Sequence, residues 1–584
     1  MALVSDLIDR LRQLQADRSQ WEQVWLETAR YALPDAERFD TMFATGNATS
    51  AIDSVVSEPV AAKRSKEIYD QTSLWAIDRG ANGTLSLVTP QSGTWHDVAT
   101  DDPFGGEPSD AEEVFYQLLR DYLFATRGNP RSGYWVAHKA GVRSMWAFGT
   151  GVRFTAESDR GITSPISYAY VPLSENHLGT NFEGVVDTNF RLFRRSVRQC
   201  VEKWGTAMSA KVQADASDPK KKDRQVTILH AVYPRDEKGT YGNTNREAPW
   251  ASCYVEVDEK NLIGESGYWE FPFVVYHWQR NNPGPYAEGP MALALADVKS
   301  LNMLAKSELR AVQTWVDPPY ATRAGTERLN LNSRAPNPGF LDEQGNLMVK
   351  PIVTQQRPDF AQTILEARRA QLRTTLYIDL WQSIISSTRE QTAYEVMIKN
   401  QEKGDLLGPV GSSLQTGLSF DFDREVGILA RKGAFETGSP LSPPDSVRGK
   451  KIGVRFTSPL DKLRRLPQLQ GMTQLATTVA QIAQFKPNVI GKVDWDAFID
   501  EARDILDVPQ KVMTPDEVLN AARQQEAAAA NAASAVETTR AAGEAATAAG
   551  EGVQTIAASP AASDVLRRLA GVAMPGGSGT GATA

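Results

Sequence analysis

Residues 286–325 read YAEGPMALALADVKSLNMLAKSELRAVQTWVDPPYATRAG, and the rest of the chain is organised around this stretch. Pro290 suits the first turn of a helix and Asp317–Pro319 ends it, so the sequence predicts one helix of roughly 27 residues, about 40 Å long. Taken alone, such a stretch is typical of an amphipathic surface helix. Its apolar seam repeats at the helical period and comprises Met291, Ala294, Val298, Leu301, Ala305, Leu309, Val312 and Val316. A separate basic strip, beside Met303, comprises Lys299, Lys306 and Arg310.

A second helix is predicted from Phe360 to Ile385, after Pro358. The residues near one of its faces are Leu365, Leu372, Leu376 and Leu380, with Arg368, Arg369 and Arg373 on or beside that face. The segment between the two helices is rich in Pro, Gly and Asn, the residues of turns. Two rods that bracket a small, turn-rich segment form a hairpin with a tip. Such a hairpin has little core of its own, so its faces need other chains.

Short motifs in a fixed order make the chain resemble the portal, or head-to-tail connector, proteins of short-tailed bacteriophages. Early in the chain, Tyr69-Asp70 precedes a small-residue helix, and Pro90 and Trp95 mark the turn after it. The later motifs are Gly289-Pro290, Asp297–Lys299 with Leu301-Asn302, Asp317–Pro319, Thr392–Val396 and Leu407–Pro409. Each motif is short, and their order and spacing carry the resemblance, which covers roughly residues 69–515.

The resemblance implies an α+β fold with the parts of a portal subunit. These parts are a mixed α/β wing (residues 1–289), a first stem helix (290–316), a clip (317–359), a second stem helix (360–385), a tunnel loop (386–392), the rest of the wing (393–457), a helical crown (458–515) and an Ala-rich extension with a tail of disordered composition (516–584). It also implies a homo-oligomeric ring, commonly of twelve copies, at one capsid vertex of the virion, assembled in the host cytoplasm.

Double-stranded DNA is expected to pass through that ring without sequence preference, inward during packaging and outward during ejection. The implied protein partners are terminase, the major capsid and scaffolding proteins, internal core proteins and a tail adaptor. One alternative is a ring-forming head-completion or tail adaptor protein, although such proteins are usually much shorter. A DNA-processing enzyme such as a terminase subunit is a third class, which lacks support from any nucleotide or nuclease motif.

The resemblance also assigns candidate site residues. The tunnel loop would present to DNA Ser386, Ser387, Thr388 and Arg389, although the same polar residues can cap the next helix, and both interpretations can hold together. Arg389 can alternatively pair with a nearby glutamate and steady that helix. The basic strip of the stem would comprise Lys299, Lys306, Arg310, Arg368, Arg369 and Arg373. Partners would bind the clip at Arg323, Arg328 and Arg334. Subunit packing would involve Val298, Leu301, Leu309 and Val312.

The composition limits which classes of protein the chain can belong to. The 584 residues have a formal net charge of −8 and only two cysteines, which argues for a reducing compartment without disulfides. A mean hydropathy of −0.37 and the lack of long apolar runs predict no membrane span and no leader. A site that grips DNA is normally basic, whereas a passage through which DNA slides is better acidic or mixed. Mild acidity also keeps a protein soluble, so charge does not decide between these explanations.

Enzyme signatures are missing from the sequence. It contains no phosphate loop, zinc-protease motif or nucleophile elbow, and five scattered histidines form no metal pattern, so we expect no cofactor, no metal and no catalysis. Acidic pairs such as Asp101-Asp102 can in principle hold Mg²⁺, but surface carboxylates are much commoner. Gly149-Thr150-Gly151 resembles a phosphate loop without the required lysine and spacing, so we predict a turn from a helix into a strand.

The other expected elements follow from periodicity and turn residues. The predicted helices are 2–33, 111–127, 134–148, 197–205, 391–404 and 411–433, the last two separated by a joint at Leu407–Pro409. The predicted strands are 152–156, 166–171, 185–193, 226–232, 252–257, 271–278 and 451–456. Residues 460–508 read as helical.

Overall fold

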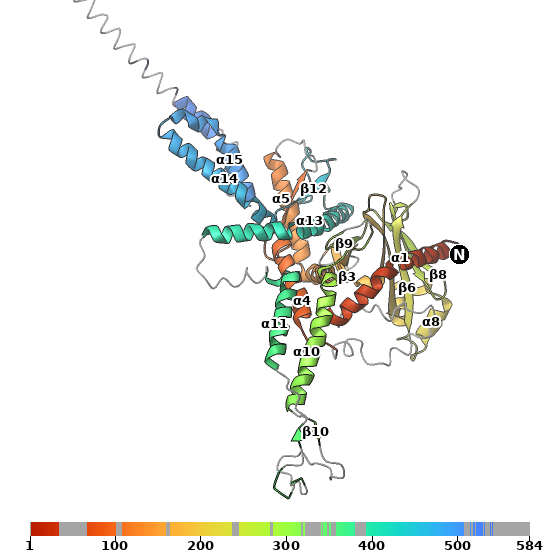
Figure 1. Cartoon of the computed structure of the whole chain (residues 1–584). Helices are drawn as coiled ribbons and strands as arrows, with labels where there is room; N and C mark the ends of the chain where they lie inside the picture. The colour runs from red at the N-terminus through yellow and green to blue at the C-terminus, as the bar shows by residue number, and fades with distance from the viewer. Residues whose placement is uncertain are drawn as a thin grey trace, which may run out of the picture. The chain divides into compact units, whose positions relative to one another are not determined.

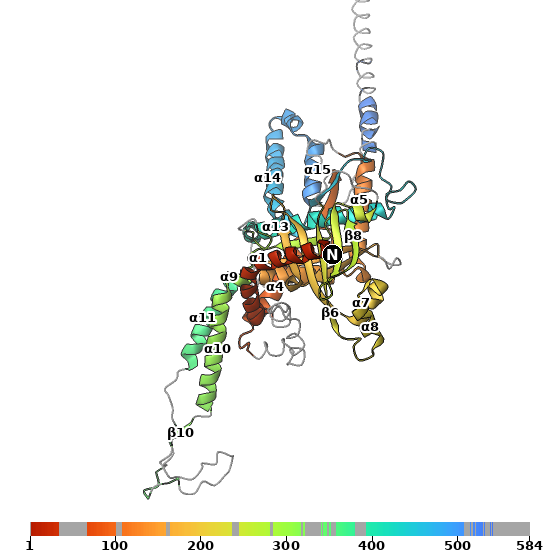
Figure 2. The same ribbon diagram turned by 90° about the vertical axis from the view of Figure 1, so that its right-hand side faces the viewer.

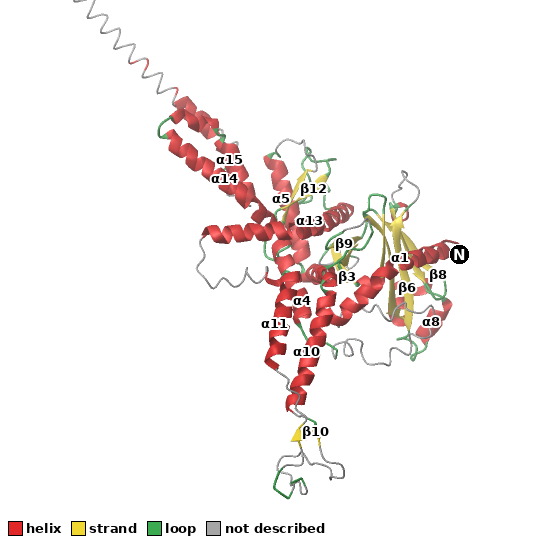
Figure 3. Ribbon diagram, viewed as in Figure 1, coloured by secondary structure: helices red, strands yellow, loops and turns green. Residues whose placement is uncertain are grey.

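The computed structural model describes residues 2–33, 67–100, 108–158, 164–235, 244–280, 284–316, 358–379 and 393–506, with short pieces within 319–351 and 514–540. The chain divides into two compact units, residues 1–506 and 507–584. The described part of the second unit includes a helical run at 521–529. The first unit is a mixture of helices and antiparallel sheets, which confirms the α+β prediction (Figure 3).

Three of the four antiparallel sheets among the described residues form the main β part of the first unit; the fourth pairs two two-residue strands. A five-stranded sheet has the order β4-β5-β6-β7-β8, a three-stranded sheet has the order β3-β2-β9, and β1 pairs with β12. The strands are β1 His96–Thr100, β2 Thr150–Glu157, β3 Ile166–Val171, β4 Asn176–Thr180, β5 Val186–Ser196, β6 Gln225–Pro234, β7 Trp250–Glu256, β8 Asn261–Tyr268, β9 Phe273–His277 and β12 Ile452–Phe456. All seven predicted strands are confirmed, and β4 and β8 were missed.

The missed strands lack the alternation on which the prediction depends. β4 reads NHLGT, and its buried side chains include polar ones: Asn189 Nδ2 donates to Asn176 Oδ1 at 2.8 Å. β8 reads NLIGESGY, and its two glycines weaken the strand pattern. Sheet neighbours decide both strands, because each pairs along its length with a predicted strand, β4 with β5 and β8 with β7.

Helices cover the sheets and tie them together (Figure 1). The helices before residue 220 are α1 Ala2–Ala32, α4 Thr72–Val88, α5 Asp110–Gly128, α6 Tyr134–Phe148, α7 Val197–Trp204 and α8 Ala210–Ser217, of which α8 was not predicted. The first half of α1 packs on the five-stranded sheet through residues such as Leu7, and its second half enters the main core through Trp25. Between them, the buried Arg18 donates through Nη1 to the carbonyl oxygens of Ser174 (3.0 Å) and Asn176 (2.8 Å).

The Gly-Thr-Gly segment is the predicted turn from a helix into a strand. Gly149 follows the last residue of α6 with φ of 83°, a conformation that favours glycine. A Cβ at Gly149 would lie 2.1 Å from the carbonyl oxygen of Ala287, and one at Gly151 would lie 2.0 Å from that of Gly141. The turn therefore brings the backbone just before the first stem helix against the end of α6, leaving no space for side chains.

The first stem helix spans the predicted residues 290–316 with one interruption. It is divided at Ala294, whose ψ of −1° departs from helical values, into α9 (Pro290–Leu293) and α10 (Leu295–Val316). The second, α11 (Pro358–Thr375), ends near Tyr377, whose φ of 57° lies in the left-handed region. The predicted helix is thus interrupted before Ile385, and residues 380–385 lie outside the described part of the chain. Two-residue strands β10 (Tyr320–Ala321) and β11 (Lys350–Pro351) pair between them.

The predicted joint at Leu407–Pro409 is wrong. A single helix, α13 (Ala393–Arg431), continues through Pro409 for 39 residues. Tertiary packing overrides the proline here. A Cβ at Gly411 would lie 2.4 Å from the Leu460 side chain, and one at Gly417 would lie 2.8 Å from the backbone of β9. After β12 come α14 (Pro459–Ala483) and α15 (Trp495–Leu506), so the helical character predicted for 460–508 is confirmed.

Four of the buried charges that connect α13 to the β2 region form two ion pairs, and we call them the charge layer: Arg127, Arg153, Asp421 and Glu425. Arg153 pairs with Asp421, which also accepts from Thr155 Oγ1 at 2.7 Å. Arg127 pairs with both carboxylate oxygens of Glu425, at 3.0 and 2.5 Å. Burial raises the pKa of Glu425, and the positive charge of Arg127 lowers it by less than burial raises it. Removing one partner of such a buried pair typically costs about 3–5 kcal/mol, so the layer fixes the position of α13.

All five histidines of the chain are buried. Burial lowers the pKa of His277 to about 4, and it lowers well below the ordinary value the pKa of His96, His138, His177 and His230. An unfolded histidine binds a proton below about pH 6.5, whereas these stay neutral to lower pH in the folded chain. The unfolded state thus binds more protons, and the free energy of unfolding falls as the pH falls below 6.5.

We therefore predict that the free energy of unfolding falls steeply as the pH is lowered below about 6.5, before the pH is low enough to protonate carboxylates. His277→Gln tests this, because glutamine can still donate to the Pro285 carbonyl oxygen that His277 Nε2 contacts at 3.0 Å. Between pH 7.5 and 5, the variant should lose about 2 kcal/mol less unfolding free energy than the natural chain. Urea unfolding at both pH values measures the difference. Equal losses would show that His277 does not titrate on unfolding in this range.

Candidate functional site

Several of the predicted site residues lie at the root of the stem, where α10 and α11 join the rest of the chain. Figures 1 and 2 show the two helices side by side, and their central residues belong to the main core. On α10, the buried Asn302 accepts through Oδ1 from the amides of Tyr69 (2.7 Å) and Asp70 (3.3 Å) and donates through Nδ2 to the Glu67 carbonyl oxygen (2.9 Å). Asn302 thus satisfies three backbone hydrogen-bonding groups just before α4.

The second stem helix reaches the same dipeptide. Arg369 of α11 donates from Nε to the Asp70 carboxylate at 2.9 Å, and the Thr72 amide donates to that carboxylate at 2.9 Å. Burial alone would raise the pKa of Asp70, but these hydrogen bonds outweigh it and the pKa is lowered. Lys306 of α10 lies over the Tyr69 ring, 5.2 Å from its centre. Tyr69-Asp70, one of the motifs that carry the resemblance, therefore holds both stem helices.

The predicted basic strip is only partly available to a ligand. Lys299 pairs with Glu27 of α1, and Arg369 pairs with Asp70 and with Glu366 at 2.7 Å. Arg310 and Arg368 are exposed, the latter donating to the Gln371 side chain at 3.2 Å. Arg373 is half-buried. The charges that the sequence places on one strip are thus divided between contacts within the chain and solvent.

The apolar seam also divides into two parts. Val298 and Leu301 are buried in the core of the same chain, at 4% and 2% exposure. Leu309 and Val312 remain 48% and 38% exposed, and Val316 is 70% exposed. The seam is therefore filled near the root and open beyond Ala305.

Two groups of predicted residues lie outside the described part of the chain. They are the clip residues Arg323, Arg328 and Arg334 and the tunnel-loop residues Ser386, Ser387, Thr388 and Arg389. The sequence reading missed Asn302 as an anchor, and it missed the charge layer. A signal for the layer was present, because charged residues interrupt the apolar runs GVRFTAE in β2 and FDFDRE in α13.

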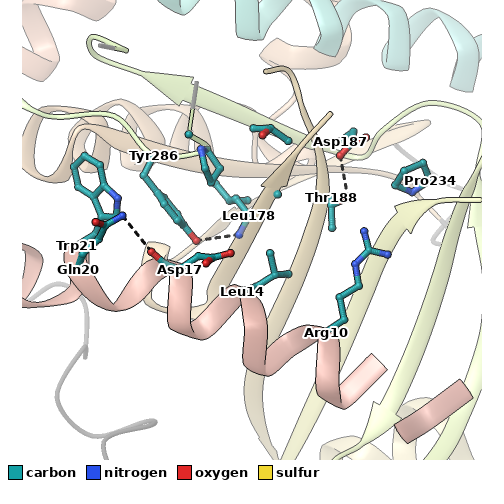
Figure 4. A pocket seen from close by; sticks show the side chains of 14 residues that line it. Arg10, Leu14, Asp17, Gln20, Trp21, Leu178, Asp187, Thr188, Pro234 and Tyr286 are labelled. Atoms are coloured by element: carbon teal, nitrogen blue, oxygen red, sulfur yellow. Dashed lines mark hydrogen bonds between the residues drawn. The ribbon is translucent and has the colours of Figure 1, made fainter. Parts of the chain in front are cut away.

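A pocket of about 510 Å³ lies between α1 and the β4–β5 hairpin (Figure 4). The rings of Trp21 and Tyr286 form one wall, 6.4 Å apart, and the carboxyl groups of Asp17 and Asp187 also line it. Burial raises the pKa of Asp187. None of the predicted site residues lines this pocket. Over the described residues, no group of three or more His, Cys, Asp or Glu side chains is placed to hold a metal ion.

Comparisons with known proteins place the chain among phage proteins. Residues 4–513 match the model of the bacteriophage head to tail connecting protein family. The chain is 25% identical over 543 residues to the portal protein of Salmonella phage epsilon15, covering 91% of this chain and 92% of that protein. It is 24% identical over 532 residues to the probable portal protein of Bordetella phage BPP-1, covering 89% and 90%. Among the described helices, none has the length and apolar content that crossing a membrane requires.

The anchorage at the stem root leads to a stability prediction. Asn302→Ala removes three hydrogen bonds and leaves two buried amides unpaired, so we expect a loss of about 2–3 kcal/mol in the free energy of unfolding. Ser300→Ala is the matched control, because Ser300 lies on the exposed side of the same helix and should change stability by less than about 0.5 kcal/mol. Urea unfolding measures both. Similar small losses in the two variants would contradict the anchoring role.

Proposed function

The chain belongs to the bacteriophage head-to-tail connecting protein family, and from that premise we propose that copies of it form a ring, of twelve by family resemblance, at one capsid vertex. DNA would pass through the ring during packaging by terminase and leave through it at ejection. The ring would assemble in the host cytoplasm with the major capsid and scaffolding proteins, and later contact internal core proteins and a tail adaptor. Relatives called portal proteins, matched over about nine-tenths of their length, support this proposal.

The observation that carries the proposal is the open half of the stem. Beyond Ala305, α10 exposes Leu309 and Val312 on the side that continues the buried seam. It also exposes Leu304 (37%) and Trp315 (63%), which lie roughly 100° further round the helix. One chain does not cover two such apolar sides. Neighbouring copies on both sides of each stem would cover them, as a ring provides.

Charge supports a channel through which DNA slides. With a net charge of −8, the chain has no overall attraction for phosphates. Two predicted stem cations, Lys299 and Arg369, are paired with carboxylates of the same chain, so we propose that Arg310 and Arg368 are the stem cations available to DNA. Arg389 of the proposed tunnel loop would add one more per copy. Sparse contacts of this kind would fall on the phosphate backbone and carry no sequence information.

The proposed ring leads to a prediction about charged substitutions at the exposed seam residues Leu309 and Val312. Leu309→Asp together with Val312→Asp should leave the monomer folded, since both residues are exposed, but should prevent assembly by placing unpaired charges in an apolar contact. Light scattering after size-exclusion chromatography, with negative-stain microscopy, should show monomers instead of rings with a central hole. Ser307→Asp, on an exposed part of α10 away from the seam, is the control and should still assemble. Rings of normal mass from the double variant would rule out this contact. A flat ring without a stalk from the natural chain would favour an adaptor.

Packaging assays separate the proposed tunnel loop from the proposed clip. Arg389→Ala should assemble with unchanged thermal stability and alter packaging efficiency or DNA retention. Arg328→Glu with Arg334→Glu should also assemble but abolish packaging or tail attachment, because terminase and the tail adaptor would lose the positive clip. Normal packaging with a small loss of stability in Arg389→Ala would assign that residue to capping its helix. Normal infectivity of the double variant would remove the clip assignment.

A further inference from the structure

The part of α14 after Arg465, with the turn that follows the helix, is unusual because its exposed surface carries no charge. From Leu466 to Phe485, twenty residues contain no Asp, Glu, Lys or Arg. Val479 is buried against the same chain, but most of the stretch is exposed, including Leu475 (49%), Ile482 (43%) and Phe485 (90%). A solvated helix face normally carries charges, whereas the centre of a protein interface is depleted of them. The composition of this surface, which we call the α14 surface, therefore fits an interface.

A second unpartnered surface lies on α5. Its exposed apolar residues recur three and four positions apart, and we call them the α5 strip: Ala111, Val114, Leu118, Tyr122 and Ala125. Val114, Leu118 and Tyr122 are 54%, 48% and 40% exposed. Another side of α5, roughly 115° round the helix from the strip, is buried in the main core. A helix with a core-facing side and a second apolar strip has two packing sides, and this chain fills one of them.

The two surfaces lie at opposite ends of a row of three helices. α15 packs on α14, and its Arg503 reaches Glu113 of α5 at 3.8 Å, so α15 stands between them (Figure 2). At 3.6 residues per turn, Leu118 and Tyr122 point about 140–180° away from Glu113 around α5. The α5 strip therefore faces away from α15. α14 is the helix at the other end of the row, and its exposed Leu475 and Ile482 lie about 40–60° round the helix from the buried Val479.

We propose that the α14 surface of one copy packs against the α5 strip of the next copy. The inference rests on the proposed ring and names a contact that would close it. Two different surfaces at opposite ends give a head-to-tail contact that repeats around a ring, whereas a surface that pairs with itself gives dimers. The borders of the surfaces are complementary: Lys486 is exposed at the end of α14, and Asp110 and Asp121 are exposed beside the α5 strip.

Cysteine cross-linking tests the contact directly. Both native cysteines, Cys200 and Cys253, are buried, so introduced thiols would react alone. The variant Leu118→Cys with Ile482→Cys, treated as assembled protein with a short bis-maleimide, should give a ladder of covalent multimers on a denaturing gel. Each single variant should stay monomeric on the same gel. Lys220→Cys with Ile482→Cys is the control, since Lys220 lies on an exposed turn of the same unit, and it should give no ladder.

Each result of the experiment decides the proposal. Rings in the microscope without a ladder from the double variant would overturn this contact and leave the proposed ring standing. Covalent dimers from Ile482→Cys alone would also overturn it, because the α14 surface would then pair with itself. A natural chain that stays monomeric would overturn the ring and this contact together. A charge exchange gives a second measurement: Leu118→Lys and Ile482→Glu should each increase the monomer fraction, and the combination should restore assembly.

Discussion

The ion pairs of Arg127 and Arg153 with Glu425 and Asp421 are the constraint on which the rest of the structure depends. A buried charge is tolerated only with its partner, so α13 has one register against β2 and α5 in which each of the four charges meets an opposite charge. Because α13 then contacts β9, β12 and α14, that register also places the helices that follow.

The stem is attached by polar contacts in the same way as α13. Asn302 and Arg369 come from different helices, yet both bind the Tyr69-Asp70 dipeptide, and apolar residues fill the space around them. Apolar packing tolerates small slides, whereas a carboxamide that satisfies three backbone groups has one position. The side chains of the dipeptide add to these backbone contacts, since Asp70 binds Arg369 of α11 and the Tyr69 ring lies under Lys306 of α10.

Periodicity in the sequence was enough to locate most elements, and helix 134–148 and strand 166–171 have the predicted bounds. It failed where distant neighbours decide the outcome. β4 and β8 depend on the strands beside them, and α13 continues through Pro409 because Gly411 and Gly417 pack closely. The predicted basic strip is interrupted by partners 272 and 299 residues away, for Lys299 and Arg369. Helical spacing groups residues on a face, but it does not show which of them already have partners.

α10 contacts the core near its N-terminal end, so a change in its angle there becomes a larger displacement at its C-terminal end. Its 22 residues extend about 33 Å, so a tilt of 5° at the root would move the far end by about 3 Å. The tightly packed backbone at Gly149 and the three hydrogen bonds of Asn302 lie at the root of the stem. A small change of angle there moves the nearby atoms very little but moves the far end of α10 much more. Substitutions at the root of the stem would therefore change the diameter of an opening formed by several copies of α10, although the residues that line the opening stay the same.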